Sequence, residues 1–405
     1  MKKPTHILIF IYNSYKDPLF QNLLLSYVKT LKQKGNYRFD LVTFEQSEYH
    51  LSPLETEEEQ QLLLQHNIHW HPQKFHTGKW LLLKKAVDAV QTILVVSKIK
   101  ITHRPTYIFA FANVAAAYSI MLSKLLHMKL VVYSYEPHSE FMKELGLWKE
   151  KDLKYKVLSW LEKQAGIYAH VVLTGTKHGV NLLKEYKSKA TLHRAPTAVD
   201  PDKFFFREDG RSKIRTLYDI ENKVVFLYLG KFGGLYYQEE LFEVFSEILN
   251  HNQNAFLLVV SSFDHELLKL WADKYGIPMA NYSITSRLTD EEVKEYISAA
   301  DIGISAVPPS PSQKFRSPTK VAEYLLCGLP YITCQGVSED DDYARDHGVG
   351  VVLDHFSRDE IRKAHPRINQ ILTSNKGSLR EKCRQIGLDY RSKERVDRLL
   401  LTTFK

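Results

Sequence analysis

Short apolar runs alternate with amphipathic helical patterns along the first half of the sequence. Apolar runs typical of buried strands lie at residues 6–11, 39–44, 106–111, 129–135 and 169–174. Patterns with the period of a helix lie between and after them, at residues 18–35, 79–99, 114–127, 153–165 and 177–186. This alternation predicts a doubly wound parallel sheet, because each helix carries the chain back to the start of the next parallel strand.

The same alternation starts again after a break. Between Arg194 and Pro201 a proline-punctuated segment interrupts the periodicity. Strand-like runs then resume at residues 224–229, 255–260, 281–285, 302–306 and 331–334, with helical patterns at 239–249, 265–275, 290–299 and 318–327. We therefore predict an α/β protein with two Rossmann-like domains, residues 1–198 and 199–377, that face each other across a cleft. Residues 378–405 are predicted as a basic helical tail, either packed back on the first domain or solvated.

The composition excludes several other classes of protein. With 405 residues, of which 44% are hydrophobic and 25% charged, the chain can bury two cores and is not disordered. Its three cysteines form no CxxC pair, so they indicate neither a disulfide framework nor a zinc site. The apolar region at residues 107–122 is shorter than the roughly 20 residues that span a bilayer. We therefore expect a cytoplasmic protein.

Positive charge is concentrated in the first half. Residues 1–200 carry 27 Lys and Arg against 17 Asp and Glu, whereas residues 201–405 carry 28 against 30. The excess suits an anionic membrane at the inner face of the cell or a lipid-phosphate acceptor, and lysines that only solvate the surface explain it equally well. Residues 79–85 and 148–156 combine tryptophan with lysines and are the expected membrane contacts; amphipathic helices with buried Trp80 and Trp148 are the alternative. No nucleic-acid partner is expected.

The most informative segment is a predicted helix with well-marked ends. Ser317 suits the N-cap, Pro318 the first helical position and Gly328 the C-terminal cap. The start of a helix offers unpaired N–H groups and a positive dipole end, and here Arg316 and Lys320 add positive charge. This end of the helix, which includes Thr319, is a candidate site for a diphosphate.

Glu323 lies six residues beyond Ser317, which corresponds to about 9 Å along a helix. That distance is comparable with the reach from a diphosphate to its ribose, and a carboxylate can accept hydrogen bonds from both ribose hydroxyls. An ordinary capped amphipathic helix with an exposed glutamate is the alternative.

Lys320-Val-Ala-Glu323-Tyr-Leu-Leu-Cys-Gly-Leu-Pro-Tyr-Ile resembles the nucleotide-binding segment of the family 4 retaining glycosyltransferases, which have the GT-B fold. Four other segments resemble motifs of the same family in the same order: residues 174–177, 195–204, 227–231 and 299–305. The resemblance covers residues from about 130 to 352. It implies GT-B architecture and transfer of a hexose from a nucleoside diphosphate sugar to a hydroxyl of a glycan or lipid-linked acceptor, with retention, in cell-surface glycan or polysaccharide biosynthesis.

The resemblance also assigns roles to single residues. It places Lys231, directly after Gly230, on the donor diphosphate, and His138 on the transferred sugar. A surface lysine and a polar loop histidine without such roles are the alternatives. The predicted catalytic residues are therefore His138, Lys231 and Lys320. The predicted donor-binding residues are Gly230, Lys231, Arg316, Ser317, Thr319, Lys320 and Glu323.

Two places depart from the family pattern. Phe315 stands where the family commonly has a second glutamate, and the segment 12–16 lacks the usual glycines. The acidic run 339–342 is interpreted as a solvated charge run, so neither a metal nor another cofactor is predicted. Two further functions stay open: a nucleotide-sugar epimerase of the same fold, and a non-catalytic nucleotide-binding partner subunit.

Overall fold

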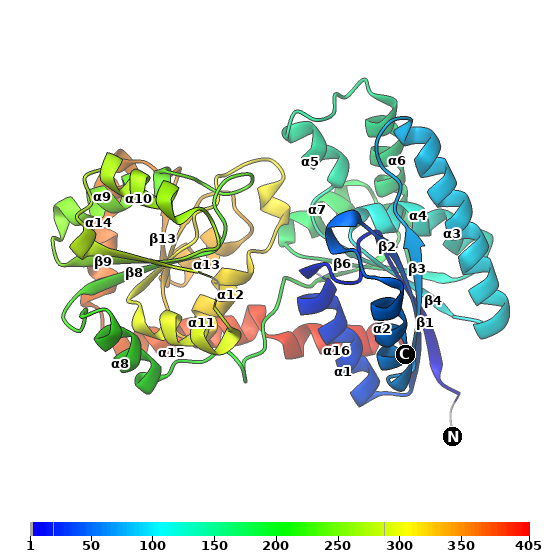
Figure 1. Ribbon diagram of the computed structural model, residues 1–405, viewed down its shortest axis with the longest axis horizontal. Helices are drawn as coiled ribbons and strands as arrows, with labels where there is room; N and C mark the ends of the chain where they lie inside the picture. The colour runs from blue at the N-terminus through cyan, green and yellow to red at the C-terminus, as the bar shows by residue number, and fades with distance from the viewer. Residues whose placement is uncertain (1–2, 19, 287) are drawn as a thin grey trace. The chain divides into compact units, whose positions relative to one another are not determined.

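The protein is described from a computed structural model, which covers residues 3–18, 20–286 and 288–405, without the side chains of residues 81 and 82 (Figure 1). The chain divides into two compact units. The first unit contains Met1–Ala195 and Val396–Lys405, and the second contains Pro196–Arg395. The boundary between the units thus lies in the proline-punctuated segment where the sequence pattern broke.

The first unit contains a seven-stranded parallel sheet in the order β3-β2-β1-β4-β5-β6-β7. Its strands are β1 (Thr5–Ile11), β2 (Tyr37–Glu45), β3 (Ile68–Lys74), β4 (Tyr107–Phe111), β5 (Lys129–Ser134), β6 (Val171–Thr174) and β7 (Thr191–Arg194). Its helices are α1 (Leu25–Lys34), α2 (Pro53–Gln65), α3 (Leu81–His103), α4 (Asn113–Leu125), α5 (His138–Glu144), α6 (Leu153–Tyr168) and α7 (Lys177–Glu185). The edge strands β3 and β7 were not predicted, because their sequences are largely polar.

The second unit contains a six-stranded parallel sheet in the order β10-β9-β8-β11-β12-β13. Its strands are β8 (Val224–Leu229), β9 (Ala255–Val260), β10 (Tyr282–Thr285), β11 (Ile302–Ile304), β12 (Tyr331–Cys334) and β13 (Gly350–Leu353). Its helices are α8 (Glu208–Leu217), α9 (Glu240–His251), α10 (His265–Lys274), α11 (Asp290–Ala299), α12 (Thr319–Leu326), α13 (Asp340–Asp346), α14 (Arg358–Thr373) and α15 (Lys376–Arg391). Two Rossmann-like parallel sheets, one in each unit, confirm the predicted fold class.

Apolar side chains fill both faces of the second sheet. Phe226 and Tyr228 of β8 point into one cluster, whereas Val225 and Leu227 of the same strand point into the other. This alternation follows from the two-residue period of a strand, and burial on both faces is typical of parallel sheets. The strands are therefore fixed rigidly, and the loops at their carboxyl ends can hold a ligand.

The C-terminal tail is helical, but it consists of two helices that belong largely to different units. Helix α15 belongs to the second unit and packs against α12. Helix α16 (Lys393–Thr403) starts beside the unit boundary, and its residues from Val396 on belong to the first unit. There the Phe404 ring lies 5.3 Å from the rings of both Tyr107 and Phe109. The single tail predicted at 378–405 is thus divided between the two units.

Candidate functional site

The candidate site lies at the carboxyl ends of β8 and β11 in the second unit. β8 is followed by a glycine-rich turn in which Gly230, Gly233 and Gly234 have φ of 148°, 73° and 63°. These angles favour glycine, since a Cβ would clash with the backbone. In this turn the N–H of Gly233 donates to the carbonyl of Tyr237, and the N–H of Tyr236 donates to the carbonyl of Gly233. The turn therefore places bare backbone beside the first turn of α12.

Lys320 of α12 reaches this glycine turn. A Cβ added at Gly230 would lie only 2.7 Å from Lys320 Nζ. The same Nζ lies 4.7 Å from the ring centroid of Tyr228 and 4.9 Å from that of Tyr236. The two predicted residues Gly230 and Lys320 are therefore in contact, beside two aromatic rings that were not predicted.

The Lys320 ammonium is buried and has no hydrogen-bond partner among the described residues. Burial lowers the pKa of this lysine to about 8, although the nearby Glu323 carboxyl opposes the shift. Burial raises the pKa of Glu323 to about 7, with Lys320 again opposing. A buried cation without a partner is costly, so this geometry suits an anionic ligand that would supply the missing partner.

The helix start differs from the prediction. α12 begins at Thr319, Pro318 occupies the N-cap position, and no side chain caps the helix. The Ser317 hydroxyl oxygen instead accepts a hydrogen bond of 3.1 Å from the N–H of Thr197. Ser317 was therefore wrongly predicted as the N-cap. Its interaction fixes the preceding loop and leaves the first N–H groups of α12 without a side-chain cap.

The C-terminal end of α12 follows the sequence closely. Gly328 has φ of 75°, and its N–H donates to the carbonyl of Leu325. The N–H of Leu329 donates to the carbonyl of Tyr324, which completes a Schellman motif. The glycine signal therefore ended the helix as predicted.

A buried arginine braces the loop before α12. Arg391 donates through Nε to the carbonyl of Thr197 and through Nη2 to that of Pro318. Its Nη1 lies 2.8 Å from Asp340, and both side chains are 1% exposed. Asp340 belongs to the acidic run that was predicted to be solvated. That interpretation was wrong, because Glu339, Asp340 and Asp341 are all buried.

The remaining predicted residues of the second unit lie around this pocket. Lys231 is exposed, and its carbonyl accepts the hydrogen bond of the Tyr228 hydroxyl. Arg316 is partly buried between the buried Phe315 and the start of α12, and Thr319 is exposed. The part of the second unit that is described thus brings Gly230, Lys320 and the start of α12 together, with Lys231 following Gly230 at the rim.

Two serines at the same end of the sheet were not predicted. Ser305 follows β11 directly, and Ser310 lies in the loop that leads to α12. The Oγ atoms of both are buried without a hydrogen-bond partner in the described chain. Nothing in the sequence distinguishes Ser305 and Ser310 from other serines, because only the fold shows that their hydroxyls are buried.

His138 lies in the first unit, at the first residue of α5. Its N–H donates a hydrogen bond of 2.7 Å to Glu162 of α6, and the Ser139 N–H and hydroxyl donate to the same carboxylate. Burial raises the pKa of Glu162 to about 7. The His138 ring lies 6.1 Å from that of Trp148. Glu162 therefore fixes the backbone that carries His138.

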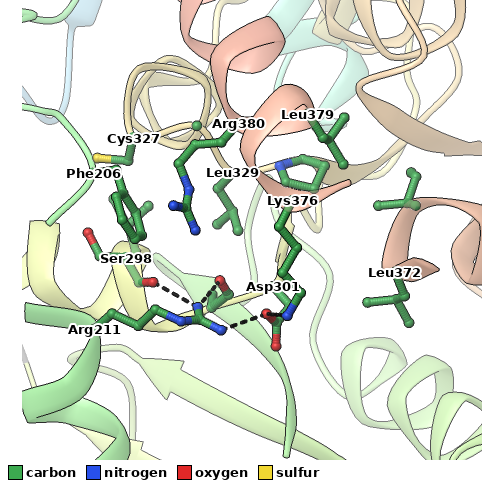
Figure 2. Close-up of a pocket in the computed structure, with 15 residues that line it drawn as sticks. Phe206, Arg211, Ser298, Asp301, Cys327, Leu329, Leu372, Lys376, Leu379 and Arg380 are labelled. Carbon is green, nitrogen blue, oxygen red and sulfur yellow. Dashed lines mark hydrogen bonds and ion pairs between the residues drawn. The ribbon is translucent and has the colours of Figure 1, made fainter. Parts of the chain in front are cut away.

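The amino edge of the second sheet holds a different pocket (Figure 2). Figure 2 shows Arg211, Lys376 and Arg380 pointing into it, beside Asp301. The Arg380 guanidinium lies 3.2 Å from the ring centroid of Phe206. Because Asp301 precedes β11 whereas Gly230 follows β8, this pocket lies at the opposite edge of the sheet from the candidate site.

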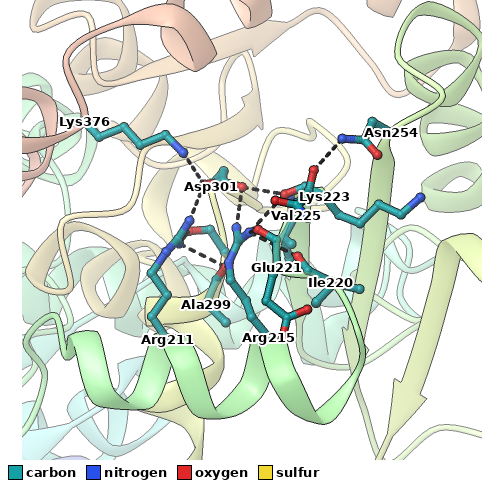
Figure 3. Close-up of polar contacts among 12 residues, drawn as sticks. Arg211, Arg215, Ile220, Glu221, Lys223, Val225, Asn254, Ala299, Asp301 and Lys376 are labelled. Atoms are coloured by element: carbon teal, nitrogen blue, oxygen red, sulfur yellow. Dashed lines mark hydrogen bonds and ion pairs between the residues drawn. The ribbon is translucent and has the colours of Figure 1, made fainter.

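Asp301 is the centre of the polar network at that amino edge (Figure 3). Its carboxylate lies 3.0 Å from Arg211, 2.6 Å from Arg215 and 3.2 Å from Lys376, and it accepts from the N–H of Val225 at 2.9 Å. Burial alone would raise the pKa of Asp301, but the two arginines lower it below its ordinary value. The network ties α8, β8 and α15 to β11 and thereby supports the sheet that carries the candidate site.

The comparisons with known proteins agree with this placement. Residues 211–389 match the family described as "Glycosyl transferases group 1". The matched segment lies within the second unit and includes Gly230, Lys320 and Glu323. No curated protein matches the chain.

Solved structures resemble the chain over nearly its full length. HepE from Anabaena in complex with UDP matches with a TM-score of 0.70 and 12% identity, covering 98% of this chain and 99% of that chain. Sucrose-phosphate synthase from Thermosynechococcus elongatus matches with a TM-score of 0.71 and 13% identity, covering 100% and 98%. WaaG, a glycosyltransferase of lipopolysaccharide biosynthesis, matches with a TM-score of 0.64 and 16% identity, covering 98% and 99%. The architecture is therefore that of the GT-B glycosyltransferases.

Proposed function

We propose that the protein is a glycosyltransferase that moves a hexose from a nucleoside diphosphate sugar to a hydroxyl acceptor, with retention of configuration. The observation that carries this proposal is the buried, unpartnered Lys320 ammonium against Gly230 in a group 1 domain. A diphosphate placed there would pair with the ammonium and with the N–H groups at the start of α12. The UDP and UDP-glucose in the HepE structures make UDP-glucose the first donor to test.

Each basic residue then has a chemical task. When the glycosidic bond to the diphosphate breaks, negative charge grows on the leaving oxygen. Lys320 stabilises this charge from inside the pocket, and Lys231 does so from its rim. Glu323, one helical turn beyond Lys320, accepts hydrogen bonds from the ribose hydroxyls. His138 contacts the sugar from the first unit. Since these cations can neutralise the diphosphate, turnover is proposed to need no metal.

We further propose that the acceptor is lipid-linked and that the first unit contacts an anionic membrane. Side chains more than half exposed repeat along one face of α3 and the residue before it: Trp80, Leu83, Val90, Leu94 and Ile101. Lys79 and Lys84 lie beside the start of this stripe, whereas Lys85 pairs with the buried Asp88 at 3.1 Å. An exposed apolar stripe flanked by lysines binds at a membrane interface, and attraction to anionic lipid contributes about 1 kcal/mol of binding free energy per lysine.

The predicted contact at 79–85 also includes the side chains of residues 81 and 82, which lie outside the described residues. Among the helices described, none combines the length and apolarity needed to cross a bilayer.

A donor panel tests the proposed reaction. The protein is incubated with UDP- and GDP-sugars, and its thermal stability is measured, because a ligand at 100 times its dissociation constant adds about 2.7 kcal/mol. Donors that stabilise the protein are then tested for release of nucleoside diphosphate with and without a lipid-linked acceptor. Release that needs acceptor supports transfer. Conversion of the sugar without acceptor would identify an epimerase, and binding with neither outcome would identify a non-catalytic subunit.

Lys231→Ala and Lys320→Ala separate binding from catalysis. Both are expected to lower kcat more than they raise KM, because the charge that they stabilise is largest in the transition state. Lys223→Ala is the matched control, since this lysine precedes β8 at the other edge of the same sheet. An increase in KM alone would show that the two lysines contribute only uniform binding.

A further inference from the structure

Four histidines surround one buried aspartate in the first unit, far along the sequence from every motif of the group 1 domain. Asp40 lies within β2 and is 0% exposed. His6 lies on the neighbouring strand β1, His71 on the other neighbour β3, and His103 is the last residue of α3. His69 completes the group, with its ring 5.0 Å from that of His103.

Three imidazole nitrogens point at the single Asp40 carboxylate. His6 Nε2 lies 2.7 Å from Oδ2, and His71 Nε2 lies 2.7 Å from Oδ1. His103 Nδ1 lies 3.0 Å from each of the two oxygens. One buried carboxylate thus faces imidazole groups from β1, β3 and α3.

The contact between His6 and Asp40 is the unusual one. His6 Nδ1 lies 2.9 Å from the backbone carbonyl oxygen of His103, and since a carbonyl only accepts, Nδ1 carries the proton. In the neutral imidazole Nε2 then has a bare lone pair, yet it lies 2.7 Å from a carboxylate oxygen. Nε2 is buried and makes no hydrogen bond there. Two acceptors this close require a cation between them, either a proton or a metal ion.

We propose that His6 Nε2, His103 Nδ1 and the Asp40 carboxylate bind a divalent transition-metal ion, with Zn²⁺ as the best fit. The three donor atoms lie within 4.8 Å of one another. Zinc binds imidazole at about 2.0–2.1 Å and carboxylate at about 2.0–2.2 Å, so small rotations of the side chains would complete the set. The hydrogen bond from His6 Nδ1 to a carbonyl is the usual support of a metal-binding imidazole.

The neighbouring groups fit this assignment. His71 remains a donor to Asp40 Oδ1 and orients the carboxylate without binding the ion itself. The His103 side chain is 33% exposed, which gives the ion a route from solvent and leaves a coordination position for water. His6 lies at the start of β1 and His103 at the end of α3, so the ion would cross-link the amino edge of the first sheet. The proposed site is thus distinct from the candidate donor site, whose residues belong to the second unit.

Zinc titration of the full chain tests the site. The protein is treated with chelator, dialysed and titrated with ZnCl₂ by calorimetry at pH 7.5, and bound zinc is counted by elemental analysis. We expect saturable binding of one zinc ion per chain. His6→Gln and His103→Gln are each expected to weaken binding at least about 100-fold.

Two other histidines supply the controls. His66→Gln removes an exposed imidazole of the same unit. His251→Gln breaks a second histidine pair, whose rings stack at 4.2 Å with Glu247 nearby, and which is the alternative place for a surface-bound ion. Neither control should change affinity or stoichiometry. The proposal is overturned by the absence of saturable binding, by full binding in His103→Gln, or by loss of binding in His251→Gln. Because His103 is partly exposed, its variant decides the matter even if His6→Gln fails to fold.

Discussion

Lys320 lies so close to Gly230 that any side chain at position 230 would have to displace its ammonium group. A Cβ there would lie 2.7 Å from Nζ and 3.3 Å from Cε of the lysine. The glycine after β8 and the lysine of α12 are separated by 90 residues, yet each requires the other's position. Both residues lie in segments that resemble motifs of the family 4 glycosyltransferases.

Gly230→Ala is the first prediction. The new methyl group must displace the Lys320 ammonium, and alanine at φ of 148° adds strain of about 1–3 kcal/mol. We expect weaker binding of the nucleotide and a lower kcat/KM in a protein that still folds. Gly234→Ala is the control, because its φ of 63° is also positive but a Cβ there would meet nothing within 4 Å. Equal losses in the two variants would assign the effect to backbone strain alone.

Nucleotide affinity should depend on pH with a maximum between about 7 and 8. In the ligand-free protein the pKa of Glu323 is about 7, so its charged, accepting form appears as pH rises through 7. The pKa of Lys320 is about 8, so its charge is lost as pH rises further. The dissociation constant of UDP measured by calorimetry from pH 5.5 to 9.5 checks this expectation. In Glu323→Gln the affinity should no longer fall at acidic pH, and in Lys320→Met it should no longer fall at alkaline pH. A wild-type affinity that does not change with pH would contradict the roles given to both residues.

Lys320→Met should stabilise the ligand-free protein. Because the folded-state pKa of this lysine is lowered from 10.5 to about 8, keeping it charged below pH 8 costs roughly 3 kcal/mol, and that cost disappears as pH rises from 8 to 10.5. Methionine fits a similar volume without charge. Urea unfolding at pH 7 should therefore show a higher midpoint for the variant, while at pH 10 the difference should shrink. A less stable variant at pH 7 would show that the ammonium already has a partner.

Asp301→Asn should destabilise the folded protein. It leaves Arg211, Arg215 and Lys376 without their common carboxylate, and breaking a buried network of this kind costs about 3–5 kcal/mol. Since the pKa of Asp301 is lowered in the folded state, its contribution is present above the ordinary pKa and is lost as pH falls through the lowered value. Urea unfolding at pH 7 and pH 3 measures both effects. The difference between wild type and variant should narrow at pH 3; a constant difference would show that the charge is not what stabilises the network.

The sequence predicts what depends on local pattern. Alternation of strands and helices predicted both sheets except for the strands β3, β7 and β13, and Gly328 marked the end of α12. Contacts between distant residues carry no such signal. Arg391 and Asp340 are 51 residues apart, and nothing near Asp340 distinguishes a buried acid from a solvated one. Ser317 matched the N-cap preference, but tertiary contact with Thr197 used its hydroxyl instead. The histidines around Asp40 come from β1, β3 and α3, so only folding brings them together.

Trp80 gives the most direct test of membrane contact. Its side chain is 80% exposed at the start of the α3 stripe, close in the sequence to Lys79 and Lys84. Trp80→Glu should reduce sedimentation with anionic vesicles by about tenfold, because it removes an interfacial aromatic and adds repulsion from the lipid charge. Met279→Glu is the matched control, since Met279 is 81% exposed in the second unit.

Binding of the wild-type protein to anionic vesicles should exceed its binding to neutral vesicles at low salt, and should fall as added salt screens the lysine charges. Equal sedimentation with the two kinds of vesicle, or equal loss in both variants, would exclude the α3 stripe as the membrane contact and leave the donor site unaffected.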